Sequence, residues 1–172
     1  MVEPLDERQQ ECWRAYIESS WALQTHLEED LRARTGLSMS DYHVLVVLSE
    51  APSRRLRMGE LAGFMVFSPS RVTYQITSMV KRGLVRRESC PGDRRGQEAV
   101  LTDEGMAALV AAAPLHLATV RDSLMDDLDD AEVAVLARVF TRLGTRLRPA
   151  GTGARRHPCA TDRPLRRDPH LA

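Results

Sequence analysis

Two stretches of the sequence combine arginine with amide and hydroxyl side chains in an arrangement suited to nucleic acid. In the first, SPSRVTYQITSMVKRG over residues 68–83, polar residues gather at the start of a helical period: Ser68, Ser70, Arg71, Thr73, Tyr74 and Gln75. In the second, SCPGDRRGQ over residues 89–97, turn formers precede Asp93, Arg94 and Arg95. A helix can enter the major groove, where arginine suits guanine edges and glutamine suits adenine edges, and a hairpin tip can lay arginine over the minor groove.

The first stretch is predicted to be a helix because both of its ends carry the usual signals. Ser68 can cap the free amides, Pro69 suits the first helical position, and Gly83 suits a C-terminal stop. Its core side is predicted from apolar residues at helical spacing: Val72, Ile76, Met79 and Val80. A short helix over residues 58–65 comes before it, with Met58, Leu61 and Ala62 expected to face inward. The two together predict a helix-turn-helix.

Further elements are expected on both sides of this pair. Strands over 84–88 and 98–101 would flank the basic turn as a β-hairpin, and 54–57 would form a basic connector or strand. One long helix is predicted from Leu5 to about Arg34, and a second is predicted with Ser40 as its N-cap. Thr102 should cap a helix towards Asp127, with a kink or break at Pro114; Asp129 and Glu132 should start a last helix ending near Leu147.

Charge is unevenly spread along the 172 residues, although the formal net charge is zero. Residues 53–96 carry ten basic and three acidic side chains, a net of +7, whereas residues 1–52 have a net of −6 and 97–147 a net of −5. A basic middle between acidic flanks is typical of one surface that faces phosphates. Arg54, Arg55, Arg57 and Lys81 are candidate phosphate contacts. Residues 148–172, rich in Pro and Arg, predict a disordered basic tail that could add nonspecific DNA affinity.

Several classes of protein are not supported by the sequence. It has no phosphate-cradling glycine loop, no GxSxG elbow and no HExxH motif, so we expect no enzyme activity. Cys12, Cys90 and Cys159 lie far apart and the histidines lack ligand spacing, so we expect no disulfide framework, no metal and no cofactor. Without a signal peptide or an apolar run of about 18 residues, a cytoplasmic location away from the membrane is expected.

The segment SCPGDRRGQEAVLTDEG resembles the signature of the multiple antibiotic resistance regulator (MarR) family, with matching residues Asp93, Arg95, Leu101, Thr102 and Gly105. The preceding segment, DYHVLVVLSEAPSRRLRMGELAGFMVFSPSRVTYQITSMVKRGLVRRE, is similar to the DNA-binding lobe of that family. The resemblance covers about residues 5–147. It implies a mainly α (α+β) fold over 1–147: a winged helix-turn-helix lobe (40–101) with N- and C-terminal dimerisation helices (5–35 and 103–147).

By this resemblance the chain would be a bacterial transcription regulator that binds a palindromic operator in duplex DNA as a homodimer. Arg95 would enter the minor groove from the tip of the hairpin, which is the wing of the fold, and Asp93 would hold this hairpin in place. Such regulators are commonly repressors released by a small effector, often phenolic or anionic. Candidate residues for the effector pocket are Trp13, Tyr16, Trp21, Tyr42, His43 and His116.

Two alternatives stay open at this point. The winged helix could serve as a protein-interaction module that does not bind DNA specifically. Cys12 lies on the first predicted helix, where peroxide-sensing members of the family carry a reactive cysteine, but its surroundings ECWRAYI match poorly and offer no obvious basic partner, which favours an inert thiol.

Overall fold

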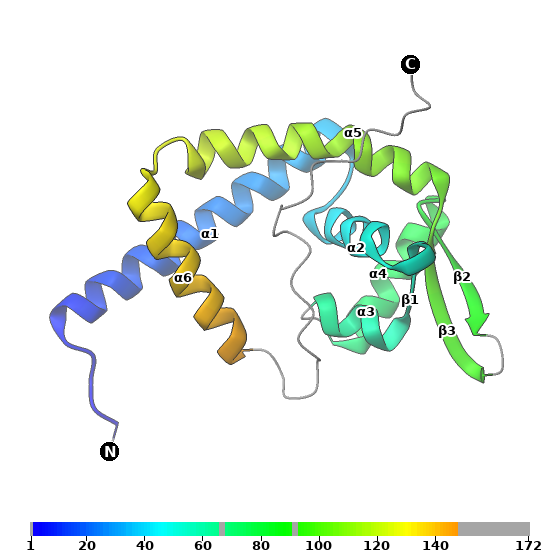
Figure 1. The fold of residues 1–172 in the computed structure, drawn as a ribbon, viewed down its shortest axis with the longest axis horizontal. Helices are drawn as coiled ribbons and strands as arrows, with labels where there is room; N and C mark the ends of the chain where they lie inside the picture. Colours follow the sequence, from blue (N-terminus) through cyan, green and yellow to red (C-terminus); the bar gives the residue numbers. More distant parts are fainter. Residues whose placement is uncertain (1, 66–67, 91–92, 148–172) are drawn as a thin grey trace. The chain divides into compact units, whose positions relative to one another are not determined.

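The structure, a computed structural model, describes residues 2–65, 68–90 and 93–147 (Figure 1). Helices dominate and accompany one small antiparallel sheet, which confirms the predicted winged helix-turn-helix fold class. The contacts divide the chain into two compact units. Of the described residues, unit 1 comprises 2–42 and Ala107–Arg142, and unit 2 comprises the described part of His43–Met106 together with 143–147.

The long helix α1 (Glu7–Thr35) begins and ends at residues that satisfy its free backbone groups. The Asp6 carboxylate accepts from the Gln9 amide at 2.8 Å, and the Asp6 amide donates to the Gln9 side chain at 3.1 Å, which is a capping box. Gly36 ends the helix in the left-handed conformation, with φ +71°. The predicted first helix is confirmed.

The start of α2 (Met39–Glu50) corrects one prediction. Ser38 rather than Ser40 is the cap: its hydroxyl accepts from the Asp41 amide at 3.0 Å, while the Asp41 carboxylate accepts from the Ser38 amide at 3.0 Å. Asp41 stands three residues after Ser38, which is the spacing that a reciprocal capping box requires. Glu28 of α1 adds a hydrogen bond from the Met39 amide at 2.6 Å.

The C-terminal part of the described chain confirms where the last helix was predicted to begin, but it shows no break in the helix before it. Helix α5 (Asp103–Val120) continues through Pro114 and passes into a π-helical turn over Arg121–Met125, so the break predicted at Pro114 is absent. Helix α6 (Asp130–Leu147) begins with the expected reciprocal bonds between Asp129 and Glu132, at 2.8 and 2.9 Å. Among the described residues, no helix is both long and apolar enough to cross a bilayer.

Unit 2 contains the sheet and the helix-turn-helix. The sheet has the order β1-β3-β2, formed by β1 (Arg55–Arg57), β2 (Val85–Cys90) and β3 (Asp93–Leu101). Ala99 of the central strand pairs with Leu56 on one side and Arg87 on the other. Both hairpin strands are longer than predicted, and the register shifts between Ser89 and Cys90.

Helices α3 (Met58–Met65) and α4 (Pro69–Lys81) pack on this sheet around a buried core. Leu61, Ala62, Val72, Ile76 and Met79 are buried as predicted. Met58 is only partly buried, and Val80 is 38% exposed, so its assignment to the core was wrong. At about 100° per residue, Val80 falls at the edge of the stripe that Val72, Ile76 and Met79 define.

Candidate nucleic-acid interface

Helix α4 presents most of its predicted polar residues to solvent because its apolar stripe fixes its rotation. Val72, Ile76 and Met79 are at most 1% exposed. The Ser68 hydroxyl accepts from the Arg71 amide at 3.4 Å and so caps the helix, as the sequence predicted. Of the predicted side chains, Gln75 is half-buried, and the others are exposed: Ser68, Ser70, Arg71, Thr73 and Tyr74. We call α4 the recognition helix and the β2–β3 hairpin the wing.

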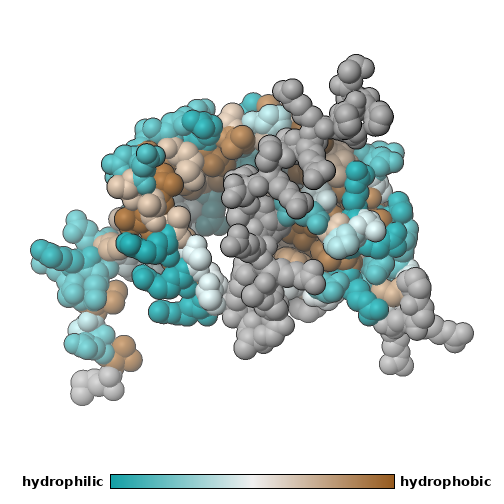
Figure 2. All heavy atoms as spheres, viewed as in Figure 1, coloured by the Kyte–Doolittle hydropathy of each residue, from teal (hydrophilic) through white to brown (hydrophobic). Residues whose placement is uncertain are grey.

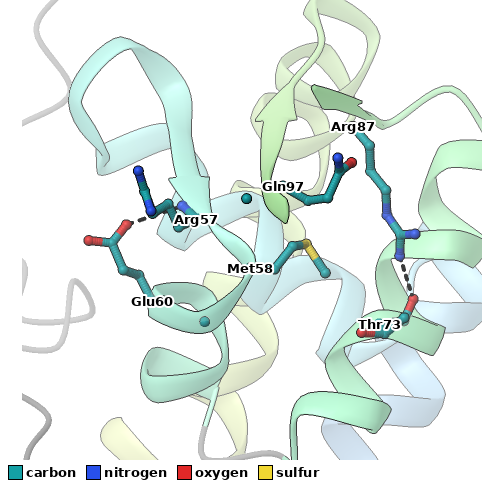
Figure 3. Close-up of a pocket in the computed structure, with 8 residues that line it drawn as sticks. Arg57, Met58, Glu60, Thr73, Arg87 and Gln97 are labelled. Atoms are coloured by element: carbon teal, nitrogen blue, oxygen red, sulfur yellow. Dashed lines mark hydrogen bonds between the residues drawn. The ribbon is translucent and has the colours of Figure 1, made fainter. Parts of the chain in front are cut away.

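A side chain of the wing is bonded directly to the recognition helix. Arg87 of β2 donates through Nη2 to the carbonyl oxygen of Thr73 at 2.8 Å (Figure 3). The same Nη2 donates to the hydroxyl of Thr77 at 3.0 Å. The Thr77 hydroxyl in turn donates to the same Thr73 carbonyl at 2.7 Å. A guanidinium with several donors in one plane therefore couples the two elements.

The recognition helix, the wing, the end of β1 and the start of α3 border an open hollow of about 650 Å³ (Figure 3). Its lining includes Arg57, Thr73, Arg87 and Gln97, which offer guanidinium, hydroxyl and amide groups. Glu60, also in the lining, accepts from the Arg57 backbone amide at 3.1 Å. Two arginines beside hydroxyl and amide donors make this hollow suited to anionic oxygens such as those of a phosphodiester.

Arg55, a predicted phosphate contact, lies between two carboxylates. Glu88 and Glu98 stand directly opposite each other on neighbouring strands, and Arg55 Nη1 lies 3.2 and 3.5 Å from them. Arg86 Nε donates to Glu88 at 2.6 Å; this bond, more than the nearby Arg55 charge, lowers the pKa of Glu88. Arg55 thus neutralises like charges that would otherwise repel across the sheet.

The other predicted basic and wing residues are placed as follows. Arg54 lies 3.4 Å from the Asp103 carboxylate, and Lys81 is exposed at the end of α4. Asp93, Arg94 and Arg95 belong to β3 by their backbone, but their side chains lie outside the described part of the structure. The predicted tail 148–172 is also outside it.

Of the predicted effector-pocket residues, Tyr42 and His116 lie together in unit 1. Their ring centroids are 4.8 Å apart. The His116 Nδ1 atom is buried and has no hydrogen-bond partner among the described residues. Burial lowers the pKa of His116, and the nearby Asp30 carboxylate partly opposes this shift. A buried nitrogen beside an aromatic ring is suited to a polar aromatic ligand.

The remaining candidates in unit 1 are at the surface. The ring centroids of Trp13 and Tyr16 lie 5.9 Å apart, and those of Tyr16 and Phe140 lie 6.1 Å apart. Trp21 and Cys12 are exposed on α1. His43 lies on α2, half-buried, and is assigned to unit 2. Within the described ranges, no three His, Cys, Asp or Glu side chains gather as a metal site.

Some residues of this region were not predicted from the sequence: Arg87, Thr77, Gln97 and the Glu88–Glu98 pair. Strand alternation could have placed Arg87 and Arg86 on opposite faces of the sheet. It could not show that α4 covers the face of Arg87, since that contact joins residues distant in the sequence.

Three comparisons relate the chain to known regulators. The sequence model of the MarR family matches residues 37–96. The HTH-type transcriptional repressor YetL of Bacillus subtilis (strain 168) is 30% identical over 121 residues, which are 69% of this chain and 72% of YetL. Sco3205, a MarR family transcriptional regulator from Streptomyces coelicolor solved in complex with DNA, is 38% identical, with a TM-score of 0.84 over 87% of this chain and 94% of Sco3205.

AbsC, a MarR family transcriptional regulator from Streptomyces coelicolor, is 39% identical, with a TM-score of 0.81 over 86% of this chain and 99% of AbsC. These similarities extend beyond the winged helix-turn-helix to most of the chain. Sequence identity, fold and the signature around the wing therefore agree, and the chain belongs to the MarR family of transcriptional regulators.

Proposed function

We propose that this chain is a transcription regulator that binds a palindromic operator in duplex DNA as a homodimer and acts as a repressor in the cytoplasm. Residues of the recognition helix would read base edges in the major groove: Ser68, Ser70, Arg71, Thr73, Tyr74 and Gln75. Arg95 would enter the minor groove, with Asp93 and Arg94 beside it in the wing. Arg57 and Lys81 would contact phosphates, with Arg54 and Arg55 at the edge of the same basic surface.

The observation that carries this proposal is the fixed orientation of α4. Its apolar side is buried, its polar side is open, and Arg87 ties it to the wing. A helix and a hairpin held in one orientation can meet adjacent grooves of a duplex without much ordering cost on binding. The 38% identical Sco3205, solved in complex with DNA, gives independent support.

A homodimer is supported by apolar side chains that unit 1 leaves open. Figure 2 shows brown, apolar side chains among hydrophilic ones in the region of α5 and α6. The exposed residues include Val110, Leu117, Val133, Val135 and Phe140. Burying such a surface against a second copy would remove apolar area from water, and the dimer would match the two-fold symmetry of a palindrome.

Release by a small phenolic or anionic effector is the regulatory part of the proposal. Tyr42 and His116 are the residues best placed for it, because one is a phenol and the other has a buried ring nitrogen available for a hydrogen bond. An effector that binds better to a form unfit for the operator would lower DNA affinity by shifting the population. Benzoate and phenol are suitable probes.

The test is selection of duplexes from a randomised pool with the full chain, followed by anisotropy titration of the enriched duplex and a scrambled one. We expect a symmetric enriched sequence, bound at least about a thousandfold more tightly than the scrambled duplex, and affinity that falls steeply with salt. Arg71→Ala should reduce this preference. Arg121→Ala, a matched loss of one exposed positive charge in unit 1, should retain it.

Equal, weak binding of both duplexes at physiological salt would contradict the proposal and favour a winged-helix module for protein contacts. A chain that sediments as a monomer while binding a symmetric sequence would contradict the homodimer alone.

A further inference from the structure

We propose that Tyr74 is a specificity-determining residue that reads the 5-methyl group of a thymine in the major groove. This inference rests on the proposed function, since it requires α4 to lie in that groove. It goes further by assigning to one side chain the chemical feature that it recognises.

The direction of Tyr74 follows from the buried side of α4. Val72, Ile76 and Met79 are at most 1% exposed and define one stripe. At about 100° per residue, Tyr74 lies on the opposite side of the helix from the centre of that stripe. Ser70 and Ser78 share its face one turn before and one turn after it, and both are short. The ring of Tyr74 therefore stands out from the middle of the helix, and the side chain is 78% exposed.

The wing prevents the helix from rolling away from this orientation. Arg87 donates to the Thr73 carbonyl at 2.8 Å (Figure 3) and to the Thr77 hydroxyl at 3.0 Å, on one flank of α4. The apolar stripe fixes the helix on one side and Arg87 fixes it on another. Tyr74 is thus held outward by its neighbours, although its own side chain is mostly in solvent.

The chemistry of the side chain selects the base feature. Tyr74 is the one aromatic residue in the sequence of α4, and its neighbours on the solvent side of the helix are small or polar. In the major groove, base edges present hydrogen-bond donors and acceptors, and thymine alone among the four bases adds a methyl group. An exposed aromatic ring gains from apolar contact with that methyl, whereas serine, arginine and glutamine suit the polar edges.

The experiment uses the full chain and the duplex enriched from the randomised pool. Each thymine of a half-site is replaced in turn by deoxyuridine, which retains the base pair and removes only the methyl. At one thymine we expect about a fourfold loss of affinity, and about a fifteenfold loss when both half-sites are changed, from the burial of one methyl per site.

Three variants separate the contributions of the ring and the hydroxyl. Tyr74→Ala should bind thymine and deoxyuridine duplexes equally, while Tyr74→Phe should keep the wild-type difference. Ser78→Ala, on the same face one turn later, is the matched control and should also keep it. All three should melt near the wild-type temperature, because neither position contributes to the buried stripe.

The inference is overturned if no thymine is sensitive to deoxyuridine, or if Tyr74→Ala shows the same sensitivity as the wild type. It is also overturned if Tyr74→Phe loses the difference, since the hydroxyl rather than the ring would then be responsible. In each case the enriched duplex would still be bound, and the proposed function would stand. A pool that enriches no sequence contradicts the proposed function and this inference together.

Discussion

Arg87 and Thr73 join the wing to the recognition helix: the guanidinium donates at 2.8 Å to a carbonyl in the middle of α4. The Thr77 hydroxyl, which donates to the same carbonyl, also accepts from Arg87. In a winged helix the two DNA-facing elements must hold a fixed separation, because the grooves that they would enter have a fixed separation. This contact links the two elements within one chain, beside the packing of the apolar stripe of α4 on the sheet.

Replacing Arg87 by alanine should therefore weaken operator binding more than it weakens folding. We expect about a tenfold loss of affinity for the selected duplex and less than about 1 kcal/mol in the free energy of unfolding, since the site is exposed. Anisotropy titration and urea denaturation measure the two quantities. Arg86→Ala is the control, because it removes the same charge from a residue bonded instead to Glu88. Equal affinity losses in the two variants would show that only charge matters.

Arg55 should stabilise the sheet through Glu88 and Glu98. In Arg55→Ala the two carboxylates would face each other directly across the strands, and like charges in that position are destabilising. We expect a lower free energy of unfolding at neutral pH and low salt, measured by urea denaturation. Adding Glu98→Gln should restore most of the loss. If Arg55→Ala alone had the same free energy of unfolding as the wild type, a structural role for Arg55 would be contradicted.

Gly105 should not tolerate even alanine. A Cβ there would collide with the Leu84 carbonyl oxygen and lie 2.8 Å from Leu101 Cδ1. The collision would disturb the Thr102 hydroxyl, which lies within donating distance of the Gly83 and Leu84 carbonyl oxygens, at 2.7 and 2.9 Å, and accepts from the Gly105 amide at 2.9 Å. Gly105→Ala should lower the free energy of unfolding by about 3 kcal/mol. Gly144→Ala, with nothing within 4 Å, should be neutral or stabilising by up to about 1 kcal/mol; thermal melting of both variants tests this contrast.

His116 should make the protein less stable as the pH falls below its ordinary pKa of 6.5. Burial lowers the pKa of His116 in the fold, so the unfolded chain binds more protons as the pH falls through this range. The free energy of unfolding should therefore decrease from about pH 7 to about pH 5. His116→Phe retains a ring beside Tyr42 and should flatten this dependence. An equally steep pH dependence in His116→Phe and the wild type would contradict this role of His116.

Features that depend on neighbours along the chain could be predicted from the residues alone. A cap needs a hydroxyl or carboxylate at one position and an amide two or three residues later, which is why Ser68 and the Asp129–Glu132 pair could be predicted. Helical period likewise identified Val72, Ile76 and Met79 as buried. Two of these local predictions were wrong. Ser38 and Ser40 are both possible caps two residues apart, and Val80 falls at the margin of the apolar stripe.

Contacts between residues distant in the sequence depend on how the elements pack in the fold. The sequence showed Arg55 and Arg87 as two among many arginines, but strand register places Arg55 between Glu88 and Glu98, and packing of α4 on the sheet brings Thr73 to Arg87. In the same way, the packing of unit 1 brings Tyr42 to His116. These contacts arise from register and packing, which are set by the whole core and not by any short segment.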